Sequence, residues 1–190
     1  MQKLEIKAAK RDVFGKKESK RIRKSEQVPC VIYGGGETVH VAVDAKALKP
    51  LIYSPNCYIV EFDIEGTKEV AVMREAQFHP VQEQILHIDF YRITPGKPVS
   101  VEIPVELVGS SEGVKQGGKL MLNKRKLTVR GLVEHLPDIL TVDISELQLG
   151  KSIFVGDLKY DNIAILTPAT AAVCAVRATR ASRSAAEEGK

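Results

Sequence analysis

Residues 57–73 read CYIVEFDIEGTKEVAVM, and this stretch decides the fold class. Two apolar runs, 57–64 and 69–73, flank Glu65-Gly66-Thr67, a short turn with glycine at its centre. Two strand-like runs joined by such a turn predict a β-hairpin. We therefore expect a mainly β protein with a few short helices.

Alternating apolar residues recur on both sides of this hairpin, which is the pattern of half-buried strands. They occur at Leu4, Ile6 and Ala8, at Val39, Val41 and Val43, and in the run 85–93. Short helices are predicted at 17–24 and at 45–51, where Asp44 is placed to cap the helix and Pro55 helps to end it. Gly34–Gly36 predicts a hairpin turn, because no Lys-Ser/Thr pair of a phosphate-binding loop follows it.

Thr94-Pro95-Gly96-Lys97-Pro98 marks a domain boundary, since prolines and glycines concentrate where few contacts cross. We expect one domain over 1–94 and a second β-rich domain over 95–178. In the second domain, strands are predicted at 99–108, 126–133 and 139–144, and a capped helical turn at 145–150. The tail 179–190 is predicted to be disordered, because its small and charged residues cannot form a core.

Positive charge is concentrated at the start of the chain. The first 24 residues hold ten lysines and arginines against three acids, about +7, whereas the whole chain is +4. Such a cluster beside a folded domain attracts a polyanion, most often RNA or DNA. The alternative is a solvated, lysine-rich surface with no partner.

Composition limits the other function classes. No stretch approaches the roughly 18 apolar residues of a membrane span, and the N-terminus shows no secretory signal pattern. Cys30, Cys57 and Cys174 are odd in number and far apart, which favours neither a disulfide framework nor zinc and indicates a cytoplasmic protein. We expect no cofactor, no metal, no membrane partner and no small-molecule substrate.

The basic segment has the residue types that phosphate binding requires. Gly15 opens a loop at Lys16 and Lys17, and Arg21 and Arg23 follow on the short predicted helix. Guanidinium groups match phosphate oxygens and guanine edges better than ammonium groups do. At the end of the next strand, Tyr33 is placed either to contact a base or ribose, or to close the edge of the core.

A second polar cluster contains Gln77, His79, His87 and Asp89. His87 and Asp89 are two residues apart on a predicted strand, so they share a face while Ile88 and Phe90 point to the core. The pair suits RNA recognition, because imidazole donates hydrogen bonds and a carboxylate accepts them from base amino groups. Three alternatives remain: a general base with its orienting carboxylate, a zinc site that includes His79, and a buried structural pair.

In their order and spacing, these motifs resemble those of a bacterial ribosomal protein family, the L-twenty-five family of the large subunit. The resemblance is to the long, two-domain form of this family, which is also called general stress protein Ctc. The matching elements are Arg11, Gly15-Lys16, Ser19–Arg23, Val28-Pro29 with Ile32–Gly34, Gln77 with His79-Pro80, His87–Phe90, Val101–Val105, Gly113–Gly118, and Pro137 with Asp143–Leu147.

The resemblance implies a structural ribosomal protein, not an enzyme, whose small closed N-terminal β-barrel binds 5S ribosomal RNA around its internal loop E. It implies an RNA interface formed by Arg11, Lys16, Lys20, Arg21, Arg23, Tyr33, Gln77, His87 and Asp89. Lys20 stands where the family often has arginine, which leaves open whether Lys20 or Arg21 makes the main phosphate contact. The partners implied are 5S ribosomal RNA and neighbours in the large subunit.

Two other classes stay open from the residues alone. One is a β-rich protein-interaction module, and the other is a small hydrolase that uses His87 and Asp89. A hydrolase would keep its activity without the basic segment, and a protein-binding module would bind with weak salt dependence.

Overall fold

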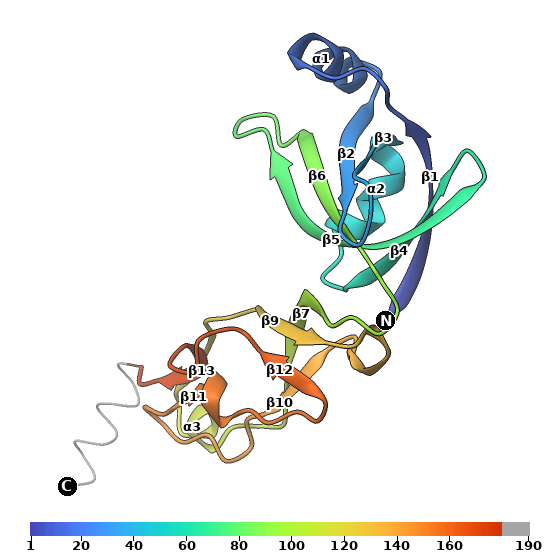
Figure 1. Ribbon diagram of the computed structural model, residues 1–190. Coiled ribbons are helices and arrows are strands. Elements are labelled where there is room, and N and C mark those ends of the chain that lie inside the picture. The colour runs from blue at the N-terminus through green and yellow to red at the C-terminus, as the bar shows by residue number, and fades with distance from the viewer. Residues whose placement is uncertain (180–190) are drawn as a thin grey trace, which may run out of the picture. The chain divides into compact units, whose positions relative to one another are not determined.

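The computed structural model describes residues 1–179, which form two compact units that divide between Val101 and Glu102 (Figure 1). The Thr94–Pro98 segment expected at the domain boundary lies a few residues before this division, between the strands β6 and β7. Apart from Thr179, the tail predicted to be disordered lies outside the described residues. No helix in residues 1–179 is long and apolar enough to cross a membrane.

The first unit is a six-stranded closed barrel, as the resemblance implies. Its strands are β1 (Gln2–Lys10), β2 (Gln27–Tyr33), β3 (Val39–Asp44), β4 (Tyr58–Ile64), β5 (Thr67–Phe78) and β6 (Ile85–Arg92). Around the barrel they follow the order β1-β3-β2-β6-β5-β4.

Parallel pairing of β1 with β4 closes this barrel. The register runs from Gln2 opposite Tyr58 to Ala8 opposite Ile64, while β1 pairs with β3 on its other side. Every strand therefore has two neighbours, and the barrel has no open edge at which another chain could add a strand.

Alternating residues of the strands fill the barrel. Cys30 and Ile32 of β2, and Ile88 and Phe90 of β6, are fully buried. The ring of Phe90 meets that of Phe62 edge to face, with centroids 4.8 Å apart. The intervening residues therefore face outward, and the alternation predicted for His87–Phe90 is confirmed.

Both helices expected in this unit are present: α1 (Lys16–Lys24) and α2 (Ala45–Ile52). As predicted, Asp44 caps α2, since its Oδ1 accepts a hydrogen bond from Lys46 N at 2.9 Å. Leu48 and Leu51 of α2 complete the barrel core. In contrast, α1 buries only Ile22, so most of its surface is free to carry charge.

The two predicted hairpins are confirmed. β4 and β5 pair from Ile59 opposite Val72 to Ile64 opposite Thr67. The glycine-rich segment turns the chain between β2 and β3, and Gly34 and Gly35 there have positive φ angles. At Gly34 a Cβ atom would lie 2.7 Å from the Tyr91 ring, so the turn requires glycine.

The second unit is β-rich, as expected. Its elements are β7 (Val99–Val108), α3 (Glu112–Lys115), β8 (Lys119–Leu122), β9 (Lys126–Gly131), η1 (Val133–His135), β10 (Leu140–Asp143), β11 (Ser152–Phe154), η2 (Val155–Asp157), β12 (Ile163–Ile165) and β13 (Ala172–Arg177). They form one sheet of order β10-β7-β9-β12 and another of order β11-β13-β8.

One local prediction for this unit is wrong. The segment 145–150 contains turns but no helix. Ser145 donates both its backbone N–H, at 2.9 Å, and its hydroxyl, at 2.7 Å, to Asp143 Oδ1. Because the serine side chain points back to Asp143, it does not cap a helix. The short α-helix of this unit lies instead at α3, where no helix was predicted.

The barrel core supports a prediction for Phe90. Phe90→Ala is expected to lower the free energy of unfolding of the first unit by about 3–5 kcal/mol, because it leaves a cavity beside Phe62. Amide hydrogen exchange of β2 in increasing urea measures the stability of this unit alone. Phe78→Ala is the control: since Phe78 is 45 % exposed, its loss should be under about 1 kcal/mol. Equal losses in the two variants would contradict this account of the core.

Candidate nucleic-acid interface

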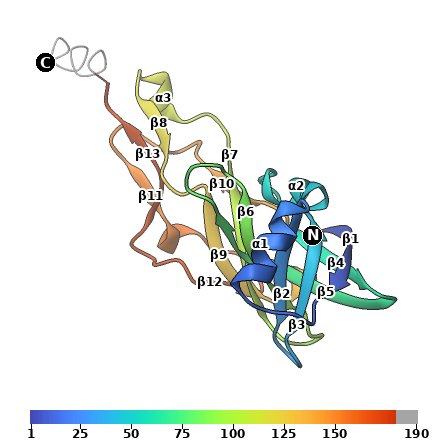
Figure 2. The ribbon, with the colours of Figure 1, turned by 90° about the horizontal axis from the view of Figure 1, so that it is seen from above.

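Arg23 attaches α1 to the barrel. Its Nε donates to the carbonyl oxygen of Leu86 at 3.0 Å, across 63 residues of sequence. Ile22, the residue before Arg23, is buried. α1 lies at the end of the barrel where β2 begins (Figure 1), so it overlaps that strand in the view from above (Figure 2). The basic helix is thereby held beside the start of the strand that carries His87 and Asp89.

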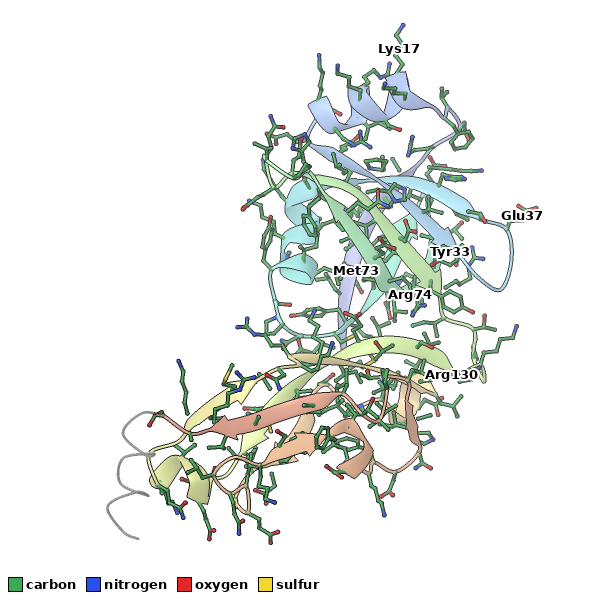
Figure 3. The ribbon with its side chains drawn as sticks, turned by 90° about the vertical axis from the view of Figure 1, so that its left-hand side faces the viewer. Lys17, Tyr33, Glu37, Met73, Arg74 and Arg130 are labelled. Carbon is green, nitrogen blue, oxygen red and sulfur yellow. The ribbon has the colours of Figure 1, made fainter. Side chains whose placement is uncertain are left out.

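The remaining cations of α1 face solvent. Exposed lysines and arginines of the helix are Lys16, Lys17, Lys20, Arg21 and Lys24. Lys17, Lys20, Arg21 and Lys24 have the spacing of one helix face, and Figure 3 shows Lys17 projecting away from the strands. Arg21 Nη2 also lies 3.1 Å from Glu18 Oε1; the Arg21 side chain is exposed, whereas that of Glu18 is partly buried. The helix therefore presents a stripe of positive charge to the outside.

His87 and Asp89 form a pair on the outer surface of β6. His87 Nδ1 lies 2.7 Å from Asp89 Oδ1, and both side chains are partly exposed. An Nδ1–H bond to a carboxylate fixes the orientation of the imidazole and leaves Nε2 for another partner. Gln77 of β5 stands directly opposite His87 in the register, so the three residues form one polar group.

One acidic neighbour of this group was not predicted. Glu75 of β5 lies opposite Asp89, next to a register shift between Met73 and Glu75. The sequence suggested that the strand stops at Met73, whereas β5 continues to Phe78. Strand alternation counted backward from Gln77 would have placed Glu75 on the same face. The polar group thus contains two adjacent carboxylates.

Arg11 lies directly after β1, where its backbone N–H donates to His40 O at 2.9 Å. Its Nε atom is buried and has no hydrogen-bond partner within residues 1–179. Burial raises the pKa of the Cys30 thiol to about 12; the positive charge of Arg11 opposes this shift, and the negative charge of Asp89 adds to it. His40 stands opposite Val31 of β2, and Val31 stands opposite Asp89 of β6, so the bond to His40 brings Arg11 to the region of the polar group.

Tyr33 is at the other end of β2, away from α1 (Figure 3). It is partly buried, and its ring meets that of Tyr91 edge to face at 5.8 Å. Along β6, Tyr91 follows His87 by four residues, or about 13 Å of extended chain. Tyr33 therefore shares the outward face of β2 and β6 with the other candidates but lies at the edge of the group.

Arg92 stabilises the turn that follows Tyr33, and its guanidinium group is bonded within the protein. Its guanidinium pairs with Glu69 at 2.8 and 3.2 Å. It also donates to the carbonyl oxygens of Gly34 and Glu37, both at 3.1 Å. Because these bonds engage the guanidinium of Arg92 within the protein, Arg92 is less available to a ligand than the exposed cations of α1 are.

The geometry gives little support to the enzymatic alternatives. His79 Nδ1 accepts hydrogen bonds from the backbone N–H groups of Val81 and Gln82, so His79 stabilises the turn between β5 and β6. No group of three possible metal ligands exists among the described residues. The cross-strand neighbour of His87 on β5 is Gln77, which is not a nucleophile.

Comparison with known proteins agrees with this architecture. Residues 6–90 match the model of the ribosomal L25p family, and residues 98–180 match that of the C-terminal domain of ribosomal protein TL5. The chain is 47% identical to the large ribosomal subunit protein bL25 of Porphyromonas gingivalis, over 98% of each chain. It is 44% identical to that of Bacteroides thetaiotaomicron, over 98% of this chain and 97% of the relative.

The attachment of α1 supports a prediction for Arg23. Arg23→Ala should speed amide hydrogen exchange across Lys16–Lys24 by about 10- to 100-fold, because one charged hydrogen bond and little buried area hold the helix. Hydrogen exchange followed by mass spectrometry measures this change. The control, Lys24→Ala, alters an exposed cation of the same helix and should leave exchange unchanged. Unaltered protection in Arg23→Ala would show that other contacts hold α1.

Proposed function

Because the chain belongs to the ribosomal L25p family, we propose that its first unit binds 5S ribosomal RNA, at the irregular helical region around internal loop E. The chain is a structural protein of the large ribosomal subunit and not an enzyme. The finer proposal concerns the RNA and the residues that contact it. These are Arg11, Lys16, Lys20, Arg21, Arg23, Tyr33, Gln77, His87 and Asp89.

The observation that carries this proposal is the hydrogen bond from Arg23 Nε to Leu86 O. It holds a helix with a positive stripe beside a strand with a hydrogen-bonding pair. Phosphate contacts fix the position of a nucleic acid, and contacts to base edges distinguish one sequence or shape from another. One surface of the first unit therefore has both kinds of group.

The stripe of α1 supplies the phosphate contacts in this proposal. Lys20 and Arg21 are both exposed, and water screens the exposed guanidinium of Arg21 in its single ion pair with the partly buried Glu18. A phosphate can therefore replace Glu18 at a small cost in free energy. The planar guanidinium of Arg21 then makes a bidentate contact with the phosphate. This favours Arg21 over Lys20 as the main phosphate ligand. Arg23 acts chiefly by positioning the helix, since its Nε is already bonded.

The polar group on β5 and β6 supplies the recognition of shape and base edges. With His87 held by Asp89 at 2.7 Å, the imidazole presents Nε2 outward in a fixed direction. The carboxylate retains lone pairs that accept from a base amino group, and the amide of Gln77 both donates and accepts. A regular A-form major groove is too narrow for such side chains, whereas an irregular helix exposes its edges.

Arg11 and Tyr33 have different roles in this proposal. Arg11 has a buried Nε without a partner in residues 1–179, so its side chain is held by packing and only its outer nitrogens can reach RNA. Tyr33 offers the part of its ring that Tyr91 does not cover, together with its hydroxyl group, to a ribose or base. Both would extend the interface to either side of His87 and Asp89.

Phosphate binding by α1 predicts a strong dependence on salt. With roughly five to eight phosphate contacts, log K for 5S ribosomal RNA should fall with log salt at a slope of about −4 to −7. Arg21→Ala should weaken binding by roughly 1–3 kcal/mol and make the slope less steep by about one. Filter binding at four salt concentrations measures both quantities.

A matched control for this experiment is Arg130→Ala, which removes an exposed arginine from β9 in the second unit. It should leave both affinity and slope unchanged. Equal losses in Arg21→Ala and Arg130→Ala would indicate diffuse attraction by total charge rather than binding at α1. A slope near zero would rule out anchoring through phosphates.

Asp89 gives the sharpest test of recognition. Repulsion between like charges predicts that Asp89→Asn strengthens RNA binding, whereas recognition of base edges predicts the reverse, because the amide places donors where acceptors are needed. We expect binding to weaken by roughly 1–3 kcal/mol. Most of the loss should fall on 5S ribosomal RNA and little on an unrelated duplex. Affinity for both RNAs and the melting temperature of the variant are measured together.

The control, Asp161→Asn, makes the same substitution at an exposed position of the second unit. It should change the affinity neither for 5S ribosomal RNA nor for the unrelated duplex. If Asp89 has only a structural role, the variant will melt at lower temperature with unaltered preference between the RNAs. Unchanged or tighter binding of 5S ribosomal RNA by a stably folded Asp89→Asn variant would refute the proposed recognition.

A further inference from the structure

The basic surface contains an apolar hollow that phosphate binding does not explain. The hollow has a volume of about 520 Å³ and lies between the segment before α1 and the helix itself. Val13 and Phe14 form its apolar part, and Lys17, Lys20, Arg21 and Lys24 form its charged part. A surface that bound only phosphate oxygens would gain nothing from exposed apolar side chains.

Phe14 is held in place although it is exposed. Its ring lies 4.6 Å from that of His40, centroid to centroid, with the planes inclined at 60°. His40 in turn accepts a hydrogen bond at its carbonyl oxygen from Arg11 N, which fixes the chain just before Phe14. Even so, 58 % of Phe14 and 63 % of Val13 remain exposed. A positioned aromatic ring with much of its surface open resembles a stacking platform rather than a core residue.

The charges around this ring favour a nucleotide over a protein segment. Four cations share the hollow with one acid, Glu18, which is already paired with Arg21 at 3.1 Å. A nucleotide matches both features of the hollow: its flat base can stack on the aromatic ring, and the phosphates on either side of it can pair with the cations. Single-stranded nucleic acid is typically bound in this way, with bases on aromatic rings and the backbone along cations.

We propose that this hollow binds one unstacked base of the RNA, with the base on Phe14 and its flanking phosphates on Lys17, Lys20 and Lys24. The inference rests on the proposed function for its choice of RNA, but the chemistry is that of any unpaired nucleotide. The stripe of α1 then does more than attract phosphates, because it selects RNA with an unpaired base at that point. Irregular RNA regions offer such bases and a regular duplex does not.

The test compares Phe14→Leu with Phe14→Trp in the full-length chain. Leucine keeps apolar bulk and every cation but has no aromatic face, and tryptophan enlarges that face. We expect Phe14→Leu to weaken binding to a 5S ribosomal RNA transcript by roughly 5- to 100-fold, as measured for loss of a stacked base. Binding to a fully paired RNA duplex should be unchanged, and so should the salt slope. Phe14→Trp should bind at least as tightly as the wild type.

The matched control is Phe154→Leu, the same substitution at a phenylalanine of the second unit that is 43 % exposed. It should alter none of these values. Melting temperatures of all variants separate loss of stacking from loss of folding. If Phe14→Leu binds the transcript as tightly as the wild type does, or if its affinity for the duplex falls by the same factor, the base site is refuted.

A short single strand distinguishes this inference from the proposed function. The probe is a six-nucleotide RNA that carries 2-aminopurine, whose fluorescence falls when the base stacks. If the wild type fails to select the 5S transcript but quenches the probe through Phe14, the base site stands and the 5S proposal fails. If it binds the transcript tightly and quenches the probe equally with Phe14→Leu, the 5S proposal stands and the base site fails.

Discussion

The parallel pairing of β1 with β4 is the constraint on which the first unit depends. It gives each barrel strand two neighbours, so no edge remains for a partner to extend. Closure also fixes which residues point outward, because the alternate positions are filled by a core that includes Phe62 and Phe90. A partner of this unit must therefore bind the outer face of the strands or the helix attached to it.

Hydrogen bonding separates the cations of the first unit into two kinds. Arg23 and Arg92 are bonded to backbone carbonyls within the fold, and they hold α1 and the turn after Tyr33 in place. Lys17 and Lys20 have no comparable bond within residues 1–179, and both are exposed. Positive charge alone does not distinguish these kinds. An arginine whose N–H groups are bonded to backbone carbonyls stabilises the fold, whereas an exposed lysine or arginine can bind a ligand.

Local pattern was sufficient to predict the barrel strands and the shared face of His87 and Asp89, because strand alternation depends only on neighbouring residues. Contacts distant in sequence could not be predicted in this way. The bond from Arg23 to Leu86 and the placement of Arg11 near Asp89 both depend on how the barrel strands pair. The extension of β5 to Glu75 and Gln77 was missed because the apolar run ends at Met73 and a bulge follows. Ser145 does not cap a helix because its hydroxyl is turned back to Asp143, a contact that the predicted helical turn did not include.

The charge of the first unit is polarised rather than merely positive. Its first 24 residues carry about +7, whereas residues 25–101 contain six lysines and arginines against ten acids, or −4. A polyanion that approaches this unit is attracted to α1 and repelled by most of the barrel, so it is oriented before contact. Glu75 and Asp89 then lie where a phosphate would be unfavourable and a base amino group favourable. In the proposed RNA complex, the same carboxylates would weaken non-specific attraction and let the barrel face select among the RNAs that the helix attracts.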